Sequence, residues 1–187
     1  VVSELAQGQE ARYRMLETIR QYSSERLLAP GEADRTSNGH FKYFLRWAER
    51  GEPELRGPQQ IEWLSQIDAE HDNLRSVLEW SLAQAEYGEE RLRLAGALLA
   101  FWNQRGHVRE GRGWLDRALA SQTAPRTGAA RAKALRAAGF LARWQGNLTT
   151  AKVVLEESVG LWRALGSADT AGLAQALVTL GEVFRAL

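Results

Sequence analysis

The chain has 187 residues, of which 44% are hydrophobic and 25% are charged, and its formal net charge at pH 7 is +1. This apolar content excludes a disordered chain and is enough for a sizeable core. The absence of cysteine excludes disulfides and thiolate metal sites, and no apolar run approaches the roughly 20 residues of a membrane span. Only four prolines are present and alternating Val/Ile/Thr runs are scarce, so we expect an all-α fold. No charged-then-apolar signal segment opens the chain, and we expect a cytoplasmic location.

The first thirty residues are the only place where strands are expected. Two short extended segments, Val1–Leu5 and Arg12–Leu16, flank a polar stretch and predict a short N-terminal β-hairpin. A frayed terminus that docks on the next helix is the alternative, because two strands alone are marginal in water. From Glu17 the apolar spacing becomes helical, and Pro30-Gly31 ends this helix.

Residues 31–87 predict helices that lead into a repeat region. One helix is expected from about residue 32 to residue 50, and Gly51-Glu52-Pro53 is expected to end it. Pro58 is a suitable first residue for the next helix, because that position needs no backbone N–H donor. An N-terminal cap at Asp68 or Asp72 would divide the following apolar stripe, so this region is either one bent helix or two.

Residues 88–187 predict two helical hairpins and one unpaired helix. The expected helices cover residues 89–105 with 108–121, residues 127–145 with 148–165, and residue 169 to the end. The pattern recurs at an offset of about 40 residues, as in helical repeat arrays. Trp102, Gly106, Gly111, Leu115 and Ala118 recur as Ala142, Gly146, Ala151, Leu155 and Ser158. Because the first residue is not methionine and no polar capping helix closes the array, we expect the chain to be part of a longer protein.

The sequence contains no catalytic or metal-binding constellation, so we expect no enzyme activity and no metal or cofactor within these residues. It has no Gly-x4-Gly-Lys-Ser/Thr loop for phosphates, and its three histidines lack the spacing of metal ligands. The net charge is −5 over residues 1–87, +6 over residues 88–136 and zero thereafter. A basic middle can attract an acidic partner, although solvated helix faces are the simpler interpretation. DNA binding is not expected, because no complete recognition module is present.

The second hairpin resembles the tetratricopeptide repeat, with small or apolar residues at the consensus phases of Leu135, Ala138, Gly139, Ala142, Ala151 and Leu155. The spacing of about 40 residues departs from the usual 34, and the usual tyrosine and final proline are missing. The resemblance implies a right-handed superhelix of antiparallel hairpins whose first helices line a concave groove. The groove residues that it implies are Arg93, Asn103, Gln104, Lys133, Arg136, Phe140, Arg143, Trp144, Gln175, Val178, Glu182 and Arg185. Their cations, amides and aromatic rings suit an acidic or aromatic peptide, or a small effector.

The front half resembles the segment that follows the nucleotide-binding domain in bacterial signal-transduction ATPases of the STAND class, some of which are LuxR-type transcriptional regulators. The resemblance rests on Arg12–Tyr22, Gly31-Glu32, His40-x2-Tyr43-Phe44-Leu45, Gln60-x2-Trp63-Leu64 and Glu70–Arg75. It implies that residues 1–30 are the tail of a winged-helix segment, residues 31–87 a helical linker and residues 88–187 the repeats. ATP would then bind only to an upstream domain.

We therefore expect a non-catalytic sensor and protein-interaction module of a transcriptional regulator. Its groove would bind a protein, a peptide or a small effector, and it would contact the nucleotide-binding domain of its own chain. A freestanding tetratricopeptide scaffold or adaptor that binds a partner peptide is the alternative.

Overall fold

The computed structural model describes residues 2–4, 12–14, 32–166 and 170–187, which fall into the units Val1–His40 and Phe41–Leu187. In the first unit, strand β1 (Val2–Glu4) pairs with strand β2 (Arg12–Arg14) in antiparallel register, with Val2 opposite Arg14. The predicted hairpin is confirmed in these residues. The helix predicted from Glu17 to Pro30 lies outside the described residues.

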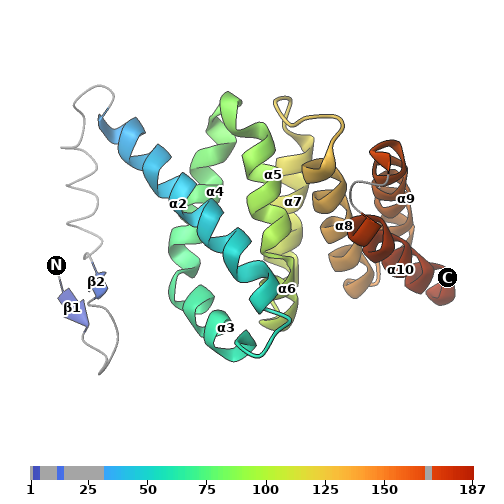
Figure 1. Ribbon diagram of the computed structural model, residues 1–187, viewed down its shortest axis with the longest axis horizontal. Helices are drawn as coiled ribbons and strands as arrows, with labels where there is room; N and C mark the ends of the chain where they lie inside the picture. Colours follow the sequence, from blue (N-terminus) through green and yellow to red (C-terminus); the bar gives the residue numbers. More distant parts are fainter. Residues whose placement is uncertain (1, 5–11, 15–31, 167–169) are drawn as a thin grey trace. The chain divides into compact units, whose positions relative to one another are not determined.

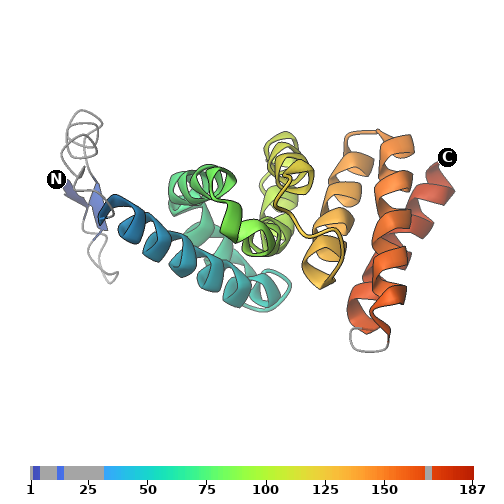
Figure 2. The same ribbon diagram turned by 90° about the horizontal axis from the view of Figure 1, so that it is seen from above.

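The second unit consists of helices, so the predicted all-α class is confirmed (Figure 1). The helices are α2 (Glu32–Glu54, which begins in the first unit), α3 (Gln60–Ala69), α4 (His71–Ala83), the 3-10 helix η1 (Ala85–Tyr87), α5 (Gly88–Ala97), α6 (Leu99–Gln104), α7 (Val108–Ala120), α8 (Ala129–Trp144), α9 (Leu148–Ala164) and α10 (Thr170–Ala186). From α5 onward the helices follow one another in chain order along the unit (Figure 2). Within the described ranges, no helix has the length and apolar character needed to cross a membrane.

Two stacked hairpins form the centre of this unit. Helix α8 packs on its partner α9 and on both α5 and α7 of the preceding hairpin, and α10 packs on α9 and α8. The pattern of buried, half-buried and exposed residues over 91–106 recurs unchanged over 131–146. Gly106 and Gly146 end the first helix of each hairpin with φ of 75° and 76°, a conformation that glycine adopts without steric cost. The tetratricopeptide class and the handedness stay predictions.

Helix α2 does not end at Gly51, as the glycine and Pro53 had predicted, but continues to Glu54. Gly51 is tolerated because its missing side chain leaves room for Trp63. An added Cβ would lie 2.5 Å from the indole Cε3 atom. Leu55 N donates to the carbonyl of Gly51, which completes the last turn beyond the proline. Tertiary packing therefore overrides two local helix breakers.

Two further helix boundaries lie at residues that the sequence did not predict. Residues 60–83 form two helices, α3 and α4, which meet at Glu70 and not at either candidate aspartate. The helix predicted over 89–105 is divided at Leu98 into α5 and α6. Both breaks lie inside continuous apolar stripes, which predict the buried face of a helix but not a change in its axis.

The second unit has two apolar clusters, and the boundary between them falls within α8. The larger cluster extends from α2 to α8 and contains Trp47, Trp63 and Trp102, while the smaller one joins α8, α9 and α10. Close helix approach depends on glycine in both. A Cβ at Gly111 would lie 2.3 Å from the Trp102 ring, and a Cβ at Gly139 would lie 2.5 Å from Leu155.

Candidate ligand pocket

A pocket of about 300 Å³ lies between α8, α10 and the turn after α2. Its lining contains Arg56, Arg136, Phe140, Ala174, Gln175, Val178, Thr179 and Glu182. Helical spacing explains why these side chains face one pocket. The two lining residues of α8 are four positions apart, and those of α10 recur at intervals of three or four. The structure thus brings five of the predicted groove residues into one pocket: Arg136, Phe140, Gln175, Val178 and Glu182.

Arg136 is the unusual member of this pocket. Only 5% of the residue is exposed, yet within the described part of the chain no hydrogen bond or salt bridge joins its guanidinium group. Burial, and then the neighbouring charge of Arg56, lower the pKa of Arg136 to about 10, while Glu52 opposes this shift. The group therefore keeps its positive charge at neutral pH, in a place where that charge is poorly solvated.

The carboxylates around Arg136 are engaged by other cations. Glu52 of α2 forms a salt bridge with Lys133. Glu182 of α10 forms a salt bridge with Arg143, with an Nη2–Oε2 distance of 3.0 Å. The pocket therefore retains positive charge although Glu182 lines it and Glu52 lies near Arg136.

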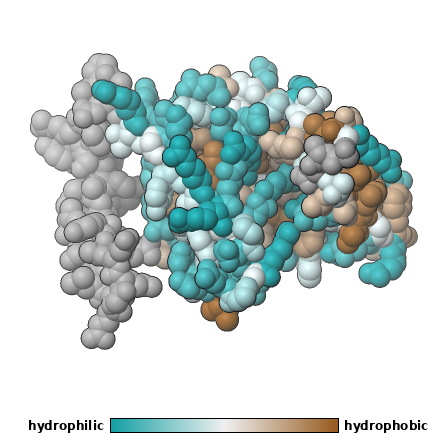
Figure 3. All heavy atoms as spheres, viewed as in Figure 1, coloured by the Kyte–Doolittle hydropathy of each residue, from teal (hydrophilic) through white to brown (hydrophobic). Residues whose placement is uncertain are grey.

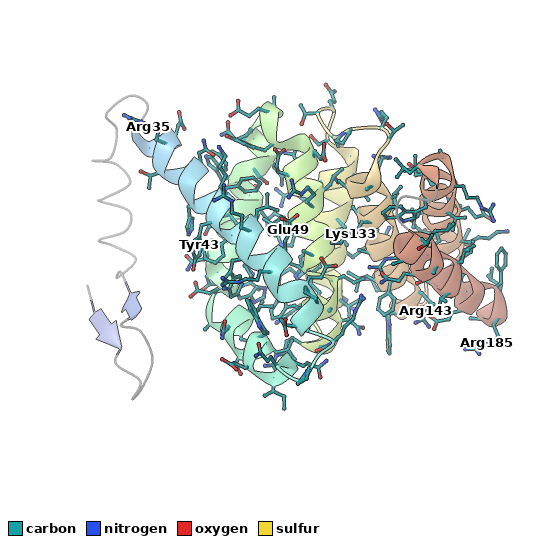
Figure 4. All side chains as sticks on the ribbon, in the orientation of Figure 1. Arg35, Tyr43, Glu49, Lys133, Arg143 and Arg185 are labelled. Atoms are coloured by element: carbon teal, nitrogen blue, oxygen red, sulfur yellow. The ribbon has the colours of Figure 1, made fainter. Side chains whose placement is uncertain are left out.

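Three other predicted groove residues contact α2 or the residue that follows it, and not the pocket. Arg93 donates to both carboxylate oxygens of Glu49, at 2.7 and 2.9 Å. Gln104 Nε2 donates to the carbonyl oxygen of Leu55 at 3.2 Å, and Lys133 binds the carboxylate of Glu52. Glu49 and Lys133 lie on the same face of the unit (Figure 4). Glu49, Leu55 and Glu52 therefore engage side chains of both hairpins, Arg93 and Gln104 of the first and Lys133 of the second.

The remaining predicted residues lie at the edges of this surface. The Arg143 guanidinium stands over the rings of Phe140 and Trp144, at 5.4 and 5.6 Å from their centroids. Trp144 is 59% exposed and faces a separate hollow of about 610 Å³ formed with residues 106–110 and Gln145. Asn103 is half-buried on α6, and Arg185 is exposed near the end of α10. Whether any of the twelve binds a ligand stays a prediction.

Sequence reasoning missed Arg56, Ala174 and Thr179. Ala174 and Thr179 are next to predicted positions on α10, so a wider helical stripe would have included them. Arg56 carries no such signal, because it lies in a turn 80 positions before Arg136 and reaches the pocket only through the tertiary path of α2.

Apolar side chains gather over the end of the unit that holds α9 and α10 (Figure 3). On α10, Leu177, Val178 and Phe184 are 41%, 64% and 50% exposed. Val178 belongs to both this surface and the pocket, so a ligand in the pocket would meet a cation on α8 and an apolar wall on α10. This combination suits a small molecule with one charged end.

Comparison with known proteins relates this all-α chain to transcriptional regulators. The chain is 32% identical, over 188 aligned residues, to the protein named "Putative HTH-type transcriptional regulator" of Mycobacterium bovis. It has the same identity to proteins of that name from two strains of Mycobacterium tuberculosis. The alignments cover 97% of this chain and 21% of each relative, so the chain spans about a fifth of the length of these curated relatives. No family model and no solved structure matches the chain.

Proposed function

We propose that this chain is the non-catalytic sensor and protein-interaction module of a multidomain transcriptional regulator of the LuxR type. The observation that carries this proposal is the similarity, over 97% of the chain, to one fifth of much longer proteins named as helix-turn-helix regulators. A helical module of such a protein has two tasks in this proposal, which are to bind an effector or partner and to contact the other domains.

The pocket gives this proposal a physical mechanism. Its walls come from α8, from α10 and from Arg56 in the turn after α2. A ligand that binds all three elements stabilises the arrangement in which they surround it, and it disfavours every arrangement in which α10 has moved away. Binding therefore shifts the conformational equilibrium of the module by the difference in affinity for the two states.

In this proposal the other functions belong to other parts of the regulator. ATP binds to a nucleotide-binding domain of the signal-transduction ATPase class, which contacts the tetratricopeptide-like repeats, and a separate helix-turn-helix domain binds DNA. The module itself works in the cytoplasm and needs no cofactor.

The complete gene product provides the test. Its ATP hydrolysis and its affinity for its promoter DNA are measured with and without compounds that raise the thermal stability of the 187-residue chain. We expect such a compound to change at least one of the two outputs. A gene product without a nucleotide-binding domain, or ATP hydrolysis by the 187-residue chain itself, would contradict the proposal.

A further inference from the structure

We propose that the pocket around Arg136 binds a small organic dianion, either a phosphate monoester or a dicarboxylate, whose charge is held by Arg136 and Arg56. The proposal rests on the proposed function, because it names the chemical class of the effector for the same pocket. Its test is nevertheless separate, since it measures binding by the 187-residue chain without any regulatory output.

Two other buried arginines of the chain differ from Arg136 in having partners. Arg91 and Arg131 are buried on α5 and α8, and both have partners. Arg91 Nη2 donates to Thr123 Oγ1 at 2.9 Å, and Arg131 Nε donates to the Glu157 carboxylate at 3.0 Å. Arg136 is 5% exposed and has no partner among the described residues, and its nitrogens are not among the fully buried unpaired atoms, so they open onto the pocket. A largely desolvated guanidinium group that faces a pocket is suited to an anion, because an anion there supplies the charge-assisted hydrogen bonds that the protein does not.

The local charge also favours an anionic ligand. Arg56, Lys133, Arg136 and Arg143 carry four positive charges at or beside the pocket, while Glu52 and Glu182 are each engaged by one of the other cations. Two positive charges remain, on Arg56 and Arg136. A dianion neutralises both, and two guanidinium groups can give a phosphate or a pair of carboxylates several charge-assisted hydrogen bonds.

The size and lining of the pocket suit a small molecule. Its volume of about 300 Å³ is too small for a helix or strand of a partner protein and lies at the lower end of small-molecule sites. The ring of Phe140 and the side chain of Val178 supply an apolar wall opposite the cations. Thr179 Oγ1 already donates to the carbonyl of Gln175, at 2.8 Å. The arginines are therefore the principal donors for an anionic group.

Calorimetric titration of the 187-residue chain at low salt tests this assignment. The probes are phenyl phosphate and succinate, with phenol, which lacks the phosphate group, and the diamide succinamide as neutral analogues. We expect the two anions to bind and the neutral analogues not to bind. Arg136→Gln should weaken anion binding by roughly 10- to 100-fold, the effect of losing a charge-assisted contact. Arg131→Gln, on the same helix, is the matched control and should change the affinity by less than about twofold, because its partner is Glu157.

Thermal unfolding keeps the test decisive if a variant is unstable. Phenyl phosphate should raise the melting temperature of the natural chain and of the Arg131→Gln variant, but not that of Arg136→Gln. Equal binding by the natural chain and Arg136→Gln would overturn the proposal, and so would a failure of both anions to bind at millimolar concentration. An aspartate-rich peptide that binds more tightly than both anions would also overturn it, in favour of a protein ligand.

The two proposals can fail separately. If the chain binds the anions through Arg136 while ATP hydrolysis and promoter affinity of the complete gene product do not respond, the anion site stands and the sensor function fails. If the complete gene product responds to a ligand whose effect persists in Arg136→Gln, the sensor function stands and the anion site is overturned.

Discussion

The two hairpins have the same backbone plan but differ in the contacts that their first helices make. Helices α5 and α6 repeat in α8 with the same order of buried and exposed positions. On the first hairpin, Glu49 of α2 engages Arg93, and the carbonyl of Leu55, just after α2, accepts from Gln104. On the second hairpin, Glu52 of α2 engages Lys133, while Arg136 and Phe140 line a pocket. The comparison teaches that the repeat determines where a side chain points, whereas the neighbouring element determines whether that side chain is available to a ligand.

Equivalent positions show where the likeness ends. Arg93 and Lys133 are 40 residues apart, and they bind Glu49 and Glu52, which are one turn apart on α2. Three residues further along each helix, the first hairpin has Gly96 and the second has Arg136. A Cβ at Gly96 would lie 3.2 Å from Lys133 Cγ, so the glycine leaves room for that lysine. The same position therefore serves packing in one hairpin and carries a buried charge in the other.

The largest effect on the free energy of unfolding is expected when a side chain is added at Gly111 of the first hairpin. Gly111→Ala places a Cβ 2.3 Å from the fully buried Trp102 ring, and we expect it to lower the free energy of unfolding by about 3 kcal/mol, as overpacking does. Urea denaturation measures this change. Gly113→Ala, on the same helix with open space around it, is the control and should raise the free energy of unfolding by up to about 1 kcal/mol.

The second hairpin suggests a compensating change. It has Ala142 and Ala151 where the first has Trp102 and Gly111. Trp102→Ala with Gly111→Ala should therefore cost less than the sum of the two single changes, because the added methyl group enters the space that the indole vacates. Additive costs would show that the two hairpins are not packed by the same rule.

The next largest effect concerns the two buried arginines of α8. Replacement of Arg136 by methionine removes a largely buried cation that has no partner among the described residues, so we expect the free energy of unfolding to rise by about 1 kcal/mol. Arg131→Met should have the opposite sign and lower it by about 1–2 kcal/mol, because Glu157 loses its partner. Both values come from urea denaturation without added anion. A loss of stability in Arg136→Met would show that the guanidinium is structural.

The sequence predicts the hairpins well because their signals are local. Gly106 and Gly146 mark the turns, and the apolar period marks the buried faces, so the helix boundaries agree to within about two residues, the ordinary uncertainty of such ends. The site was predicted only in part. The stripe on α10 indicated Gln175 and Glu182, but no pattern shows that α2 engages Arg93 and Lys133 and leaves Arg136 unpaired. That result depends on contacts between residues more than 40 positions apart, which a periodic pattern does not encode.

A smaller effect on stability is expected at low pH, where the first hairpin has an ionisable group that the second lacks. Glu110 of α7 accepts from Arg75 at 2.7 Å, and this hydrogen bond is the main cause that lowers the pKa of Glu110 to about 2. The equivalent position of α9 is Thr150, which does not ionise. A lowered carboxyl pKa stabilises the fold above the ordinary pKa of about 4.5, and this contribution disappears as the pH falls from 4.5 towards 2.

We therefore expect the natural chain to lose about 2 kcal/mol more than Glu110→Gln across this interval, the value being reduced because Arg75 is partly exposed. Urea denaturation at several pH values measures the difference. His71 also contacts Glu110, and burial lowers the pKa of His71. The folded state therefore also loses stability through His71 as the pH falls below 6.5, the ordinary pKa of histidine. Parallel pH profiles for the natural chain and Glu110→Gln would contradict the assignment.

The smallest effect on stability should be the most informative about the pocket. Glu52→Gln breaks the salt bridge with Lys133, and Glu49→Gln breaks the equivalent one with Arg93. Each should lower the free energy of unfolding by less than about 1 kcal/mol, because these pairs are only partly buried.

The effects of these two changes on anion binding should differ, since of the two glutamates only Glu52 acts electrostatically on Arg136. Glu52→Gln should tighten the binding of phenyl phosphate by about threefold, the effect of removing one nearby negative charge through a screening solvent. Glu49→Gln should leave the affinity unchanged, and an equal gain in both variants would mean that net charge, and not the unpaired arginine of the second hairpin, attracts the anion.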